Sequence, residues 1–179
     1  MNEYVLFVNS LAKKEKKSRE DHAEVKRVEL HAHTTMSSMD AVVSVKDLIK
    51  TADRWGWPAV AVTDHGVVQA FPDAAKALSS CKSDLKVIYG MEGYLVQQDH
   101  LQKRANHIIM LAKNPNGLRN LYQLVSLAHL RYFHRQPRLP KHIIEEYRSG
   151  LLIGSACEAG ELIRAIEEQR TDEELLSLI

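Results

Sequence analysis

The sequence has 179 residues, enough for one compact domain with its own hydrophobic core. Its 24 Lys and Arg balance its 23 Asp and Glu, so the charge gives no indication of nucleic-acid or membrane binding. There is no apolar run of about 18 residues and no signal-peptide pattern at the start. The two cysteines, Cys81 and Cys157, lie far apart. These features exclude a membrane span and a disulfide scaffold, and we expect a cytoplasmic protein.

The first 26 residues differ in character from the rest. Residues 3–9 predict one short strand, and residues 10–26 form a charged segment without an apolar stripe, typical of a solvated helix or a linker. A single strand with a linker cannot fold alone. We therefore expect residues 1–26 to be the end of a preceding domain, and residues 27–179 to form the main domain.

From Arg27 onward, predicted strands alternate with predicted helices. The expected strands lie at 28–33, 58–63, 85–96, 107–112 and 150–156. The expected helices lie at 44–55, 71–81, 117–130 and 143–147, with a last one from about 158. Residues 114–117 predict a turn, and the two prolines within 131–142 predict a loop. This alternation predicts an α/β fold with a parallel sheet, open or closed into a barrel.

Capping signals and apolar faces support the first two helices. Ser44, followed three residues later by Asp47, predicts a helix start, and Gly56 predicts its end. The expected buried face of the first helix is Val45, Leu48, Ile49 and Ala52, and that of the second is Ala74, Ala75, Ala77 and Leu78.

A His-x-His pattern at His31 and His33 stands on the first predicted strand, so both imidazoles should project from the same face. Asp40 follows after a short loop. Such a pair is a weak metal signal by itself. It gains weight only if other segments bring further ligands to the same place.

Further candidates follow the next strands, where sites gather in parallel α/β folds. Asp64 with His65, Glu92 and Cys157 each come at the carboxyl end of an apolar run. His107 instead begins its strand, which would place it at the opposite end of a parallel sheet. Each candidate also has a simpler reading: Asp64 as a helix cap beside a bystander His65, Glu92 in an ion pair, and Cys157 as a small buried residue.

The chemistry of this set suggests more than one divalent ion. Imidazole suits Zn, Mn or Fe, carboxylates can bridge ions, and thiolate favours Zn. Two ions about 3.5–4 Å apart can activate a water and stabilise both oxygens of a displacement at phosphorus. The reaction this predicts is hydrolysis of a phosphate ester.

Four segments resemble a known family. H-A-H-T-T-M-S-S-M-D-A, W-G-W-P-A-V-A-V-T-D-H-G, V-I-Y-G-M-E and G-L-L-I-G-S-A-C-E-A-G-E are similar to the polymerase and histidinol phosphatase (PHP) domain, in particular that of PolC-type bacterial DNA polymerase III. The segment N-P-N-G-L-R-N-L-Y-Q-L-V also matches. The resemblance runs in order from Arg27 to the C-terminus.

The resemblance implies a distorted seven-stranded β/α barrel that binds up to three divalent metals, Zn, Mn or Fe. The ligands it implies are His31, His33, Asp40, His65, Glu92, His107 and Cys157. Asp64 belongs to the motif as a residue behind the ligands, and the catalytic group would be a metal-activated water. DNA and the other polymerase domains are the implied partners, with a phosphate ester as the substrate.

The sequence departs from the family pattern in three ways, which change what we expect of the barrel, its metals and the neighbouring domains. The family's late Asp-x-His pair is absent from the sequence, and only about five barrel strands are predicted, so we expect an incomplete barrel with fewer than three metals. The 14 residues from Gly93 to Asn106 are too few for the exonuclease that PolC polymerases carry there. Residues 1–26 resemble the end of the oligonucleotide-binding domain that precedes PHP in PolC.

Three functions are therefore open. The first is a PHP fragment with a phosphoesterase-type metal site. The second is a non-catalytic module that metals stabilise within the polymerase, and the third is a free-standing PHP phosphatase. The basic residues Arg131, Arg135, Arg138 and Lys141 predict a solvated loop, with contact to a DNA backbone as the alternative.

Overall fold

The computed structural model describes residues 10, 12, 19–101 and 104–178. The predicted strand at 3–9 lies outside the described residues. Residues 19–26 of the charged segment contain no helix and run beside the end of the first helix, where the Trp57 indole donates to Asp21 at 2.8 Å. The described part of the segment is therefore not the solvated helix that the sequence left open.

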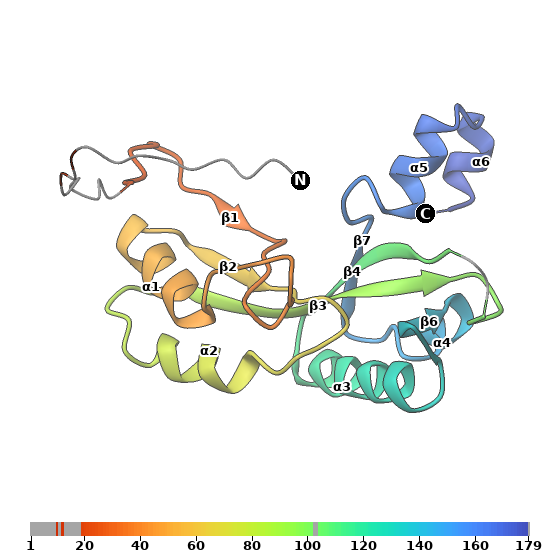
Figure 1. Cartoon of the computed structure of the whole chain (residues 1–179), viewed down its shortest axis with the longest axis horizontal. Coiled ribbons are helices and arrows are strands. Elements are labelled where there is room, and N and C mark those ends of the chain that lie inside the picture. The colour runs from red at the N-terminus through yellow and green to blue at the C-terminus, as the bar shows by residue number, and fades with distance from the viewer. Residues whose placement is uncertain (1–9, 11, 13–18, 102–103, 179) are drawn as a thin grey trace.

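Seven strands and six helices follow from Val28 onward in the described residues (Figure 1). The first half consists of β1 (Val28–Glu29), α1 (Val45–Trp55), β2 (Ala59–Val62), α2 (Phe71–Leu78) and β3 (Lys86–Val96). The second half consists of β4 (Asn106–Ala112), α3 (Pro115–Leu130), β5 (Phe133–His134), β6 (Gln136–Pro140), α4 (Lys141–Glu146), β7 (Leu151–Gly154), α5 (Glu161–Glu167) and α6 (Asp172–Leu176).

The sheet is mixed, so the prediction of a parallel sheet is only half right. Its strands follow the order β1-β2-β3-β4-β7, and the pairs β1–β2 and β2–β3 are parallel. The pairs β3–β4 and β4–β7 are antiparallel. Apolar runs show that a strand is buried but do not encode its direction, which depends on how the connecting segments pack.

The long strand β3 joins the two halves of the molecule. Its first residues pair with β2, and its last three pair in parallel with β6. Figure 1 shows α2 and α3 on the same side of the sheet, with α5 and α6 apart from them toward the C-terminus. The sheet path ends at β1 and β7 in the described residues, so the fold is a partial, distorted α/β barrel, as predicted.

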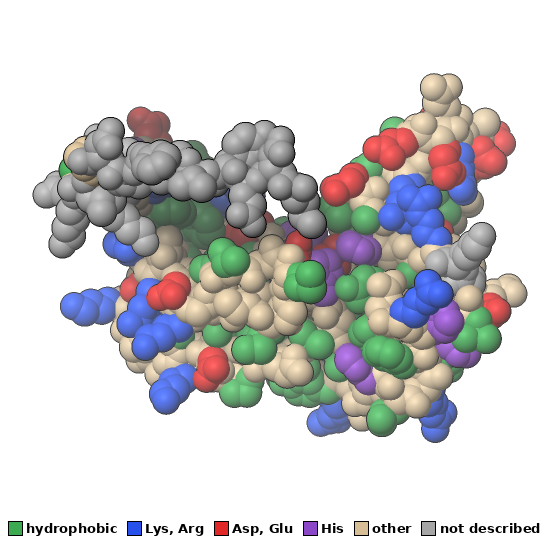
Figure 2. Space-filling view, viewed as in Figure 1, with side chains coloured by type: hydrophobic (Ala, Val, Ile, Leu, Met, Phe, Trp, Pro, Cys, Tyr) green, Lys and Arg blue, Asp and Glu red, His purple; other side chains and the backbone are tan. Residues whose placement is uncertain are grey.

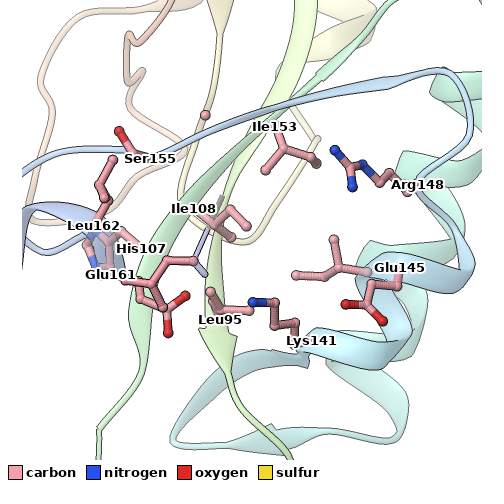
Figure 3. Close-up of a pocket in the computed structure, with 13 residues that line it drawn as sticks. Leu95, His107, Ile108, Lys141, Glu145, Arg148, Ile153, Ser155, Glu161 and Leu162 are labelled. Carbon is pink, nitrogen blue, oxygen red and sulfur yellow. The ribbon is translucent and has the colours of Figure 1, made fainter. Parts of the chain in front are cut away.

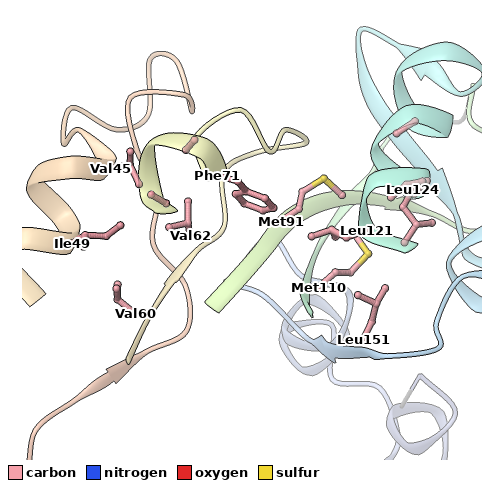
Figure 4. Packing of buried hydrophobic residues seen from close by; sticks show 14 of the residues in the cluster. Val45, Ile49, Val60, Val62, Phe71, Met91, Met110, Leu121, Leu124 and Leu151 are labelled. Atoms are coloured by element: carbon pink, nitrogen blue, oxygen red, sulfur yellow. The ribbon is translucent and has the colours of Figure 1, made fainter. Parts of the chain in front are cut away.

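One hydrophobic core runs under both halves (Figure 4). Side chains of α1, α2 and β2 meet on one side, and those of β3, β4 and α3 meet on the other, with Phe71 and Met91 between them. Burial of such side chains is the main stabilising contribution to the fold, about 1.5–3 kcal/mol for each large one.

Helix α1 begins and ends where the capping signals predict. Ser44 Oγ accepts from the Asp47 amide at 3.1 Å, and Gly56 closes the helix in the left-handed region with φ 71°. The Asp47 carboxylate accepts from the Ser44 hydroxyl at 2.7 Å, which reinforces the cap. Val45, Ile49 and Ala52 are buried as expected, and Leu48 packs against their cluster.

Other local predictions need correction. In α2, Ala75 is exposed, and Phe71 takes a place in the buried face. The predicted turn at 114–117 is the start of α3, with Asn114 as N-cap and Pro115 in the first turn, where its missing amide hydrogen costs nothing.

The predicted loop at 131–142 contains β5, β6 and the start of α4. Its prolines are tolerated because Pro140 is the last residue of β6, where the pairing with β3 ends, and Pro137 lies opposite the two-residue β5. Arg138 is 4% exposed and donates to the His100 carbonyl at 2.8 Å. It is thus a structural residue and no longer a candidate for contact with DNA, whereas Arg131 and Arg135 are exposed.

Candidate metal centre

His31 and His33 follow β1 in an extended segment, since β1 itself ends at Glu29, earlier than predicted. Ala32 between them is fixed to the end of β2: its amide donates to Thr63 Oγ1, and its carbonyl accepts from the Thr63 amide, both at 2.9 Å. The two flanking imidazoles consequently project to the other side together. Their Nε2 atoms lie 3.1 Å apart, as the alternation predicts.

Asp40 reaches the same place from the loop that follows. The loop turns at Met39, whose φ of 67° lies in the left-handed region. Asp40 Oδ2 then lies 3.3 Å from Nε2 of His65, while the Asp40 side chain stays half exposed. Asp40 therefore lies on the solvent side of the cluster.

Asp64 and His65 leave β2 in different directions. Asp64 is 1% exposed and accepts from the Thr34 amide, the Thr34 hydroxyl and the Ser37 hydroxyl. His65 turns toward β3, where its backbone forms a bridge with Glu92. The structure thus places Asp64 behind the cluster and His65 within it.

Glu92 is the centre of the cluster. Its side chain is 1% exposed, and its Oε2 lies 2.9 Å from His33 Nε2, 3.1 Å from His31 Nε2 and 3.3 Å from His65 Nδ1. It stands in the middle of β3, not at the strand end that the sequence predicts. Because β2 stops opposite Tyr89, Glu92 lies just beyond the carboxyl end of β2, level with His65.

His107 lies inside the site because β4 is antiparallel to β3. Its Nδ1 is 2.8 Å from Glu92 Oε1, so the expectation from a parallel strand, that His107 lies at the far end, is wrong. Cys157 follows β7, and its Sγ is 3.7 Å from His107 Nδ1 and 3.9 Å from Glu92 Oε1. The His107 amide donates to the Ala159 carbonyl at 2.9 Å, which holds the Cys157 turn over the sheet.

One pocket of about 300 Å³ brings the predicted ligands together. Its lining consists of His31, His33, Asp40, His65, Glu92, His107, Cys157, Glu158 and Ala159. Figure 2 shows histidine and acidic side chains meeting in the hollow between the two halves of the molecule. Glu158 and Ala159 were not singled out in the sequence, because only the fold of the turn after β7 brings them to the rim.

A second pocket, of about 370 Å³, lies beside α4 and shares only His107 with the cluster (Figure 3). Aliphatic side chains such as Leu95, Ile108 and Ile153 line much of it. Lys141 and Arg148 contribute two positive charges, and Glu145 and Glu161 contribute two negative charges, so the pocket has no preference for an anion. The predicted chemistry thus belongs to the smaller pocket.

Burial and hydrogen bonds shift the pKa values of the cluster. Burial alone would raise the pKa of Glu92, but hydrogen bonds from His107, His31 and His33 outweigh it and hold that pKa well below its usual range. The hydrogen bond to Glu92 raises the pKa of His33, whereas burial lowers the pKa of His65. Burial also raises the pKa of the Cys157 thiol and, together with the charge of Glu92, that of Tyr94.

Three groups of side chains could hold a metal ion: His31, His33 and Glu92; His33, Asp40 and His65; and His65, Glu92 and His107. Within the described part of the chain, the buried Nδ1 of His65 has no hydrogen-bond partner, although it faces Glu92 Oε2. Three imidazole nitrogens also converge on that one oxygen. Ligand atoms about 2.0–2.1 Å from a tetrahedral ion lie about 3.3 Å from one another, so this crowding fits a shared cation.

The PHP domain model matches residues 29–179. The chain belongs to the PHP domain family. It is 41% identical over 138 residues to the PolC-type DNA polymerase III of Staphylococcus aureus, a match that covers 72% of this chain and 9% of that protein. It is 27% identical to the PolC-type DNA polymerase III of Clostridium perfringens, over 97% of this chain and 26% of that protein.

The chain spans about a quarter or less of the length of these relatives. The match to the Clostridium protein extends over 372 residues, more than this chain contains, so the relative carries residues between the matched segments that have no counterpart here.

Solved structures show a weaker likeness. A candidate metal-dependent phosphoesterase from Bifidobacterium adolescentis has a TM-score of 0.44 and 19% identity, over 57% of this chain and 33% of that one. An amidohydrolase from Chromobacterium violaceum has a TM-score of 0.40 and 21% identity, over 54% and 32%. Among the described residues, no helix is both long and apolar enough to cross a membrane.

Proposed function

We propose that this chain is the PHP part of a PolC-type DNA polymerase III and that its cluster binds divalent metal ions in a site of phosphoesterase type. The observation that carries the proposal is the buried Glu92 carboxylate, with three imidazole nitrogens within 3.3 Å of Oε2 and a fourth 2.8 Å from Oε1. The proposal implies DNA replication as the process, and DNA and the other polymerase domains as partners.

The two oxygens of Glu92 face two different sets of ligands. Oε2 faces His31, His33 and His65, and Oε1 faces His107 and Cys157. Asp40 adds a carboxylate beside His65. A carboxylate shared in this way suits more than one ion, although we expect fewer than the three that the family resemblance implies.

A bound divalent ion would lower the pKa of a water and polarise a phosphoryl oxygen, which is what hydrolysis of a phosphate ester needs. The residues of this chain then have simple roles. The imidazoles and Glu92 hold the ion, the half-exposed Asp40 leaves access from solvent, and the buried Asp64 orients the segment that carries His33. Zn, Mn and Fe all suit these donors, and the Cys157 thiolate would favour Zn.

Metal analysis of the purified chain, joined to a phosphodiesterase assay with bis-p-nitrophenyl phosphate, tests the proposal. We expect one or two ions per chain after reconstitution with Zn²⁺ or Mn²⁺, and hydrolysis only in their presence. A chain that binds neither ion with a dissociation constant below about a millimolar would overturn the metal site. Binding without hydrolysis would overturn the catalytic part alone.

A structural role for the metals is a second candidate, and one observation favours it. The ligands lie on β3 and β4 and on the segments that follow β1, β2 and β7, so a bound ion would join parts of the sheet that are far apart in sequence. Metal binding would then contribute to folding stability, by about 2.7 kcal/mol when the free ion is at 100 times its dissociation constant. Loss of thermal stability on chelation, without any hydrolysis before or after, would support this role.

A free-standing phosphatase is the third reading and has less support. The long relatives are named as polymerases, and this chain matches only a small part of each. DNA contact at Arg131 and Arg135 also remains a proposal. Replacing both with Ala should lower salt-sensitive DNA binding of the full polymerase if they touch the backbone, and leave it unchanged if they are only solvated.

A further inference from the structure

Behind the metal cluster lies a buried hydrogen-bond network around Asp64. This carboxylate is 1% exposed and accepts from three donors: the Thr34 amide at 2.6 Å, the Thr34 hydroxyl at 2.8 Å and the Ser37 hydroxyl at 2.7 Å. Thr34 and Ser37 are themselves buried. A hydroxyl has only one hydrogen, so the Ser37 and Thr34 hydroxyl protons are both committed to Asp64.

The proton count at Ser37 fixes the protonation of one nitrogen of His33. Besides its bond to Asp64, Ser37 Oγ lies 3.1 Å from the His65 amide, which donates to it, and 3.3 Å from His33 Nδ1. Because the Ser37 proton is already used, Nδ1 must be the donor in the contact with His33. Ser37 Oγ then donates once and accepts twice, which satisfies it completely.

The geometry points to Ser37 as a positioning residue for His33, an inference that rests on the proposed metal site. With one proton held on Nδ1, Nε2 is the nitrogen whose proton, otherwise donated to Glu92, a metal ion would replace, so that the ring would offer its lone pair from Nε2. That atom faces Glu92 Oε2 at 2.9 Å and His31 Nε2 at 3.1 Å, the centre of the first candidate metal group. Ser37 thus transmits the orienting effect of Asp64 to a metal ligand, as carboxylates commonly do for histidine ligands.

Ser37 fixes a second ligand through the backbone. Its Oγ accepts from the His65 amide, and the His33 and His65 rings stack with centroids 4.3 Å apart and an interplanar angle of 12°. One buried hydroxyl therefore sets the ring of His33 and the backbone of His65. Loss of this hydroxyl should loosen two of the three members of the group His33, Asp40 and His65.

The test compares Ser37→Ala, Ser37→Thr and the control Ser38→Ala in this chain. Ser38 is exposed and lies next to Ser37, so its replacement matches the chemical change without touching the network. Zn²⁺ affinity is measured by competition with a chromophoric chelator. We expect Ser37→Ala to weaken binding by about 10–100-fold, Ser37→Thr, which keeps a hydroxyl, to recover most of it, and Ser38→Ala to match the wild type.

A second measurement does not depend on metal. ¹⁵N NMR of the histidine rings in the metal-free chain should show a slowly exchanging Nδ1 proton on His33 in the wild type and in Ser38→Ala. In Ser37→Ala this proton should exchange too fast to detect. Wild-type affinity in Ser37→Ala, or a His33 Nδ1 without a proton in the wild type, would overturn the inference. Failure of the wild type to bind metal would instead overturn the proposed function, and the NMR result would still decide the role of Ser37.

Discussion

The imidazole of His107 lies 2.8 Å from the carboxylate of Glu92, although the two residues are 15 positions apart in the sequence. Strand β4 returns antiparallel to β3 and pairs Ile109 with Glu92, which places His107 diagonally across from Glu92 on the same face of the sheet. An antiparallel return needs only a short connection. The site therefore assembles without any domain inserted between β3 and β4.

Replacement of the central carboxylate should have the largest effect on metal binding. Glu92→Gln keeps the size of the side chain but removes the charge that four imidazoles share. We expect the affinity for Zn²⁺ to fall by more than the roughly 100-fold that loss of an orienting residue costs, and the thermal stabilisation by metal to vanish. Isothermal titration and thermal unfolding measure the two effects.

The control for that change is Glu158→Gln. Glu158 lines the same pocket but is exposed and belongs to none of the three candidate groups. Glu158→Gln removes one negative charge, as Glu92→Gln does, but at the rim of the pocket. Solvent screens a charge there, so we expect a Zn²⁺ affinity within about threefold of the wild type. Equal losses in both variants would mean that only the net charge of the pocket matters.

Cys157 should decide the preference for Zn and part of the pH dependence. Burial raises the pKa of its thiol, so the thiol is protonated at neutral pH and Zn²⁺ must displace that proton. Zn²⁺ affinity should consequently rise between pH 7 and 9, and the slope of log affinity against pH should fall by about one proton in Cys157→Ser. Mn²⁺ affinity should change less, because Mn²⁺ prefers oxygen and nitrogen donors.

Cys81→Ser is the matched control for Cys157→Ser. Its thiol lies outside the cluster and donates to the Ala77 carbonyl of α2 at 3.6 Å. We expect it to leave both the Zn²⁺ affinity and its pH slope unchanged. A pH slope that is the same in all three proteins would show that the Cys157 thiol is not a ligand.

Helix α1 shows which features a sequence can predict. The Ser44 cap and the Gly56 termination each depend on contacts within a few residues, so local signals suffice. The same holds for His31 and His33, whose shared direction follows from the geometry of an extended chain. The ends of the apolar runs then supplied further candidates, family resemblance implied which of them are ligands, and the structure brings all of those into one pocket.

Strand direction shows where sequence reasoning fails. His107 conflicts with a parallel sheet, and the conflict comes from the direction assumed for β4, which no local pattern encodes. Ser37 was missed for a similar reason. It became visible only once the fold placed its hydroxyl between Asp64 and His33, which are 31 positions apart in the sequence.

The contact between Gly117 and Gly150 should be a strict packing constraint on α3. A Cβ at Gly117 would lie 1.8 Å from the carbonyl oxygen of Gly150, a backbone atom that the Lys113 amide also holds. Gly117→Ala should destabilise the chain by about 3 kcal/mol, at the upper end of overpacking effects, despite the better helix propensity of alanine. Urea unfolding followed by circular dichroism measures this free energy.

Gly154→Ala tests the same change where space is available. A Cβ there would meet Ile109 Cβ at 3.4 Å, an ordinary contact, so we expect a loss below about 1.5 kcal/mol. If both variants lose the same stability, the close approach of α3 to the turn before β7 is not what constrains Gly117.

Asp53 should make part of the stability dependent on acid pH. Its carboxylate lies near the end of α1 and accepts from the Ser83 hydroxyl, the Ser83 amide and the Lys82 amide. These hydrogen bonds hold the pKa of Asp53 below its usual range, and the bond from the Ser83 hydroxyl has the largest effect. A carboxyl with a lower pKa in the folded than in the unfolded state stabilises fully above the unfolded value of about 3.9, and this contribution is lost as pH falls through the folded value. Asp53→Asn should therefore lower the melting temperature at pH 7, and the difference from the wild type should shrink below about pH 4. The exposed neighbour Asp84, changed to Asn, should show no such pattern, and a constant difference at every pH would contradict the prediction.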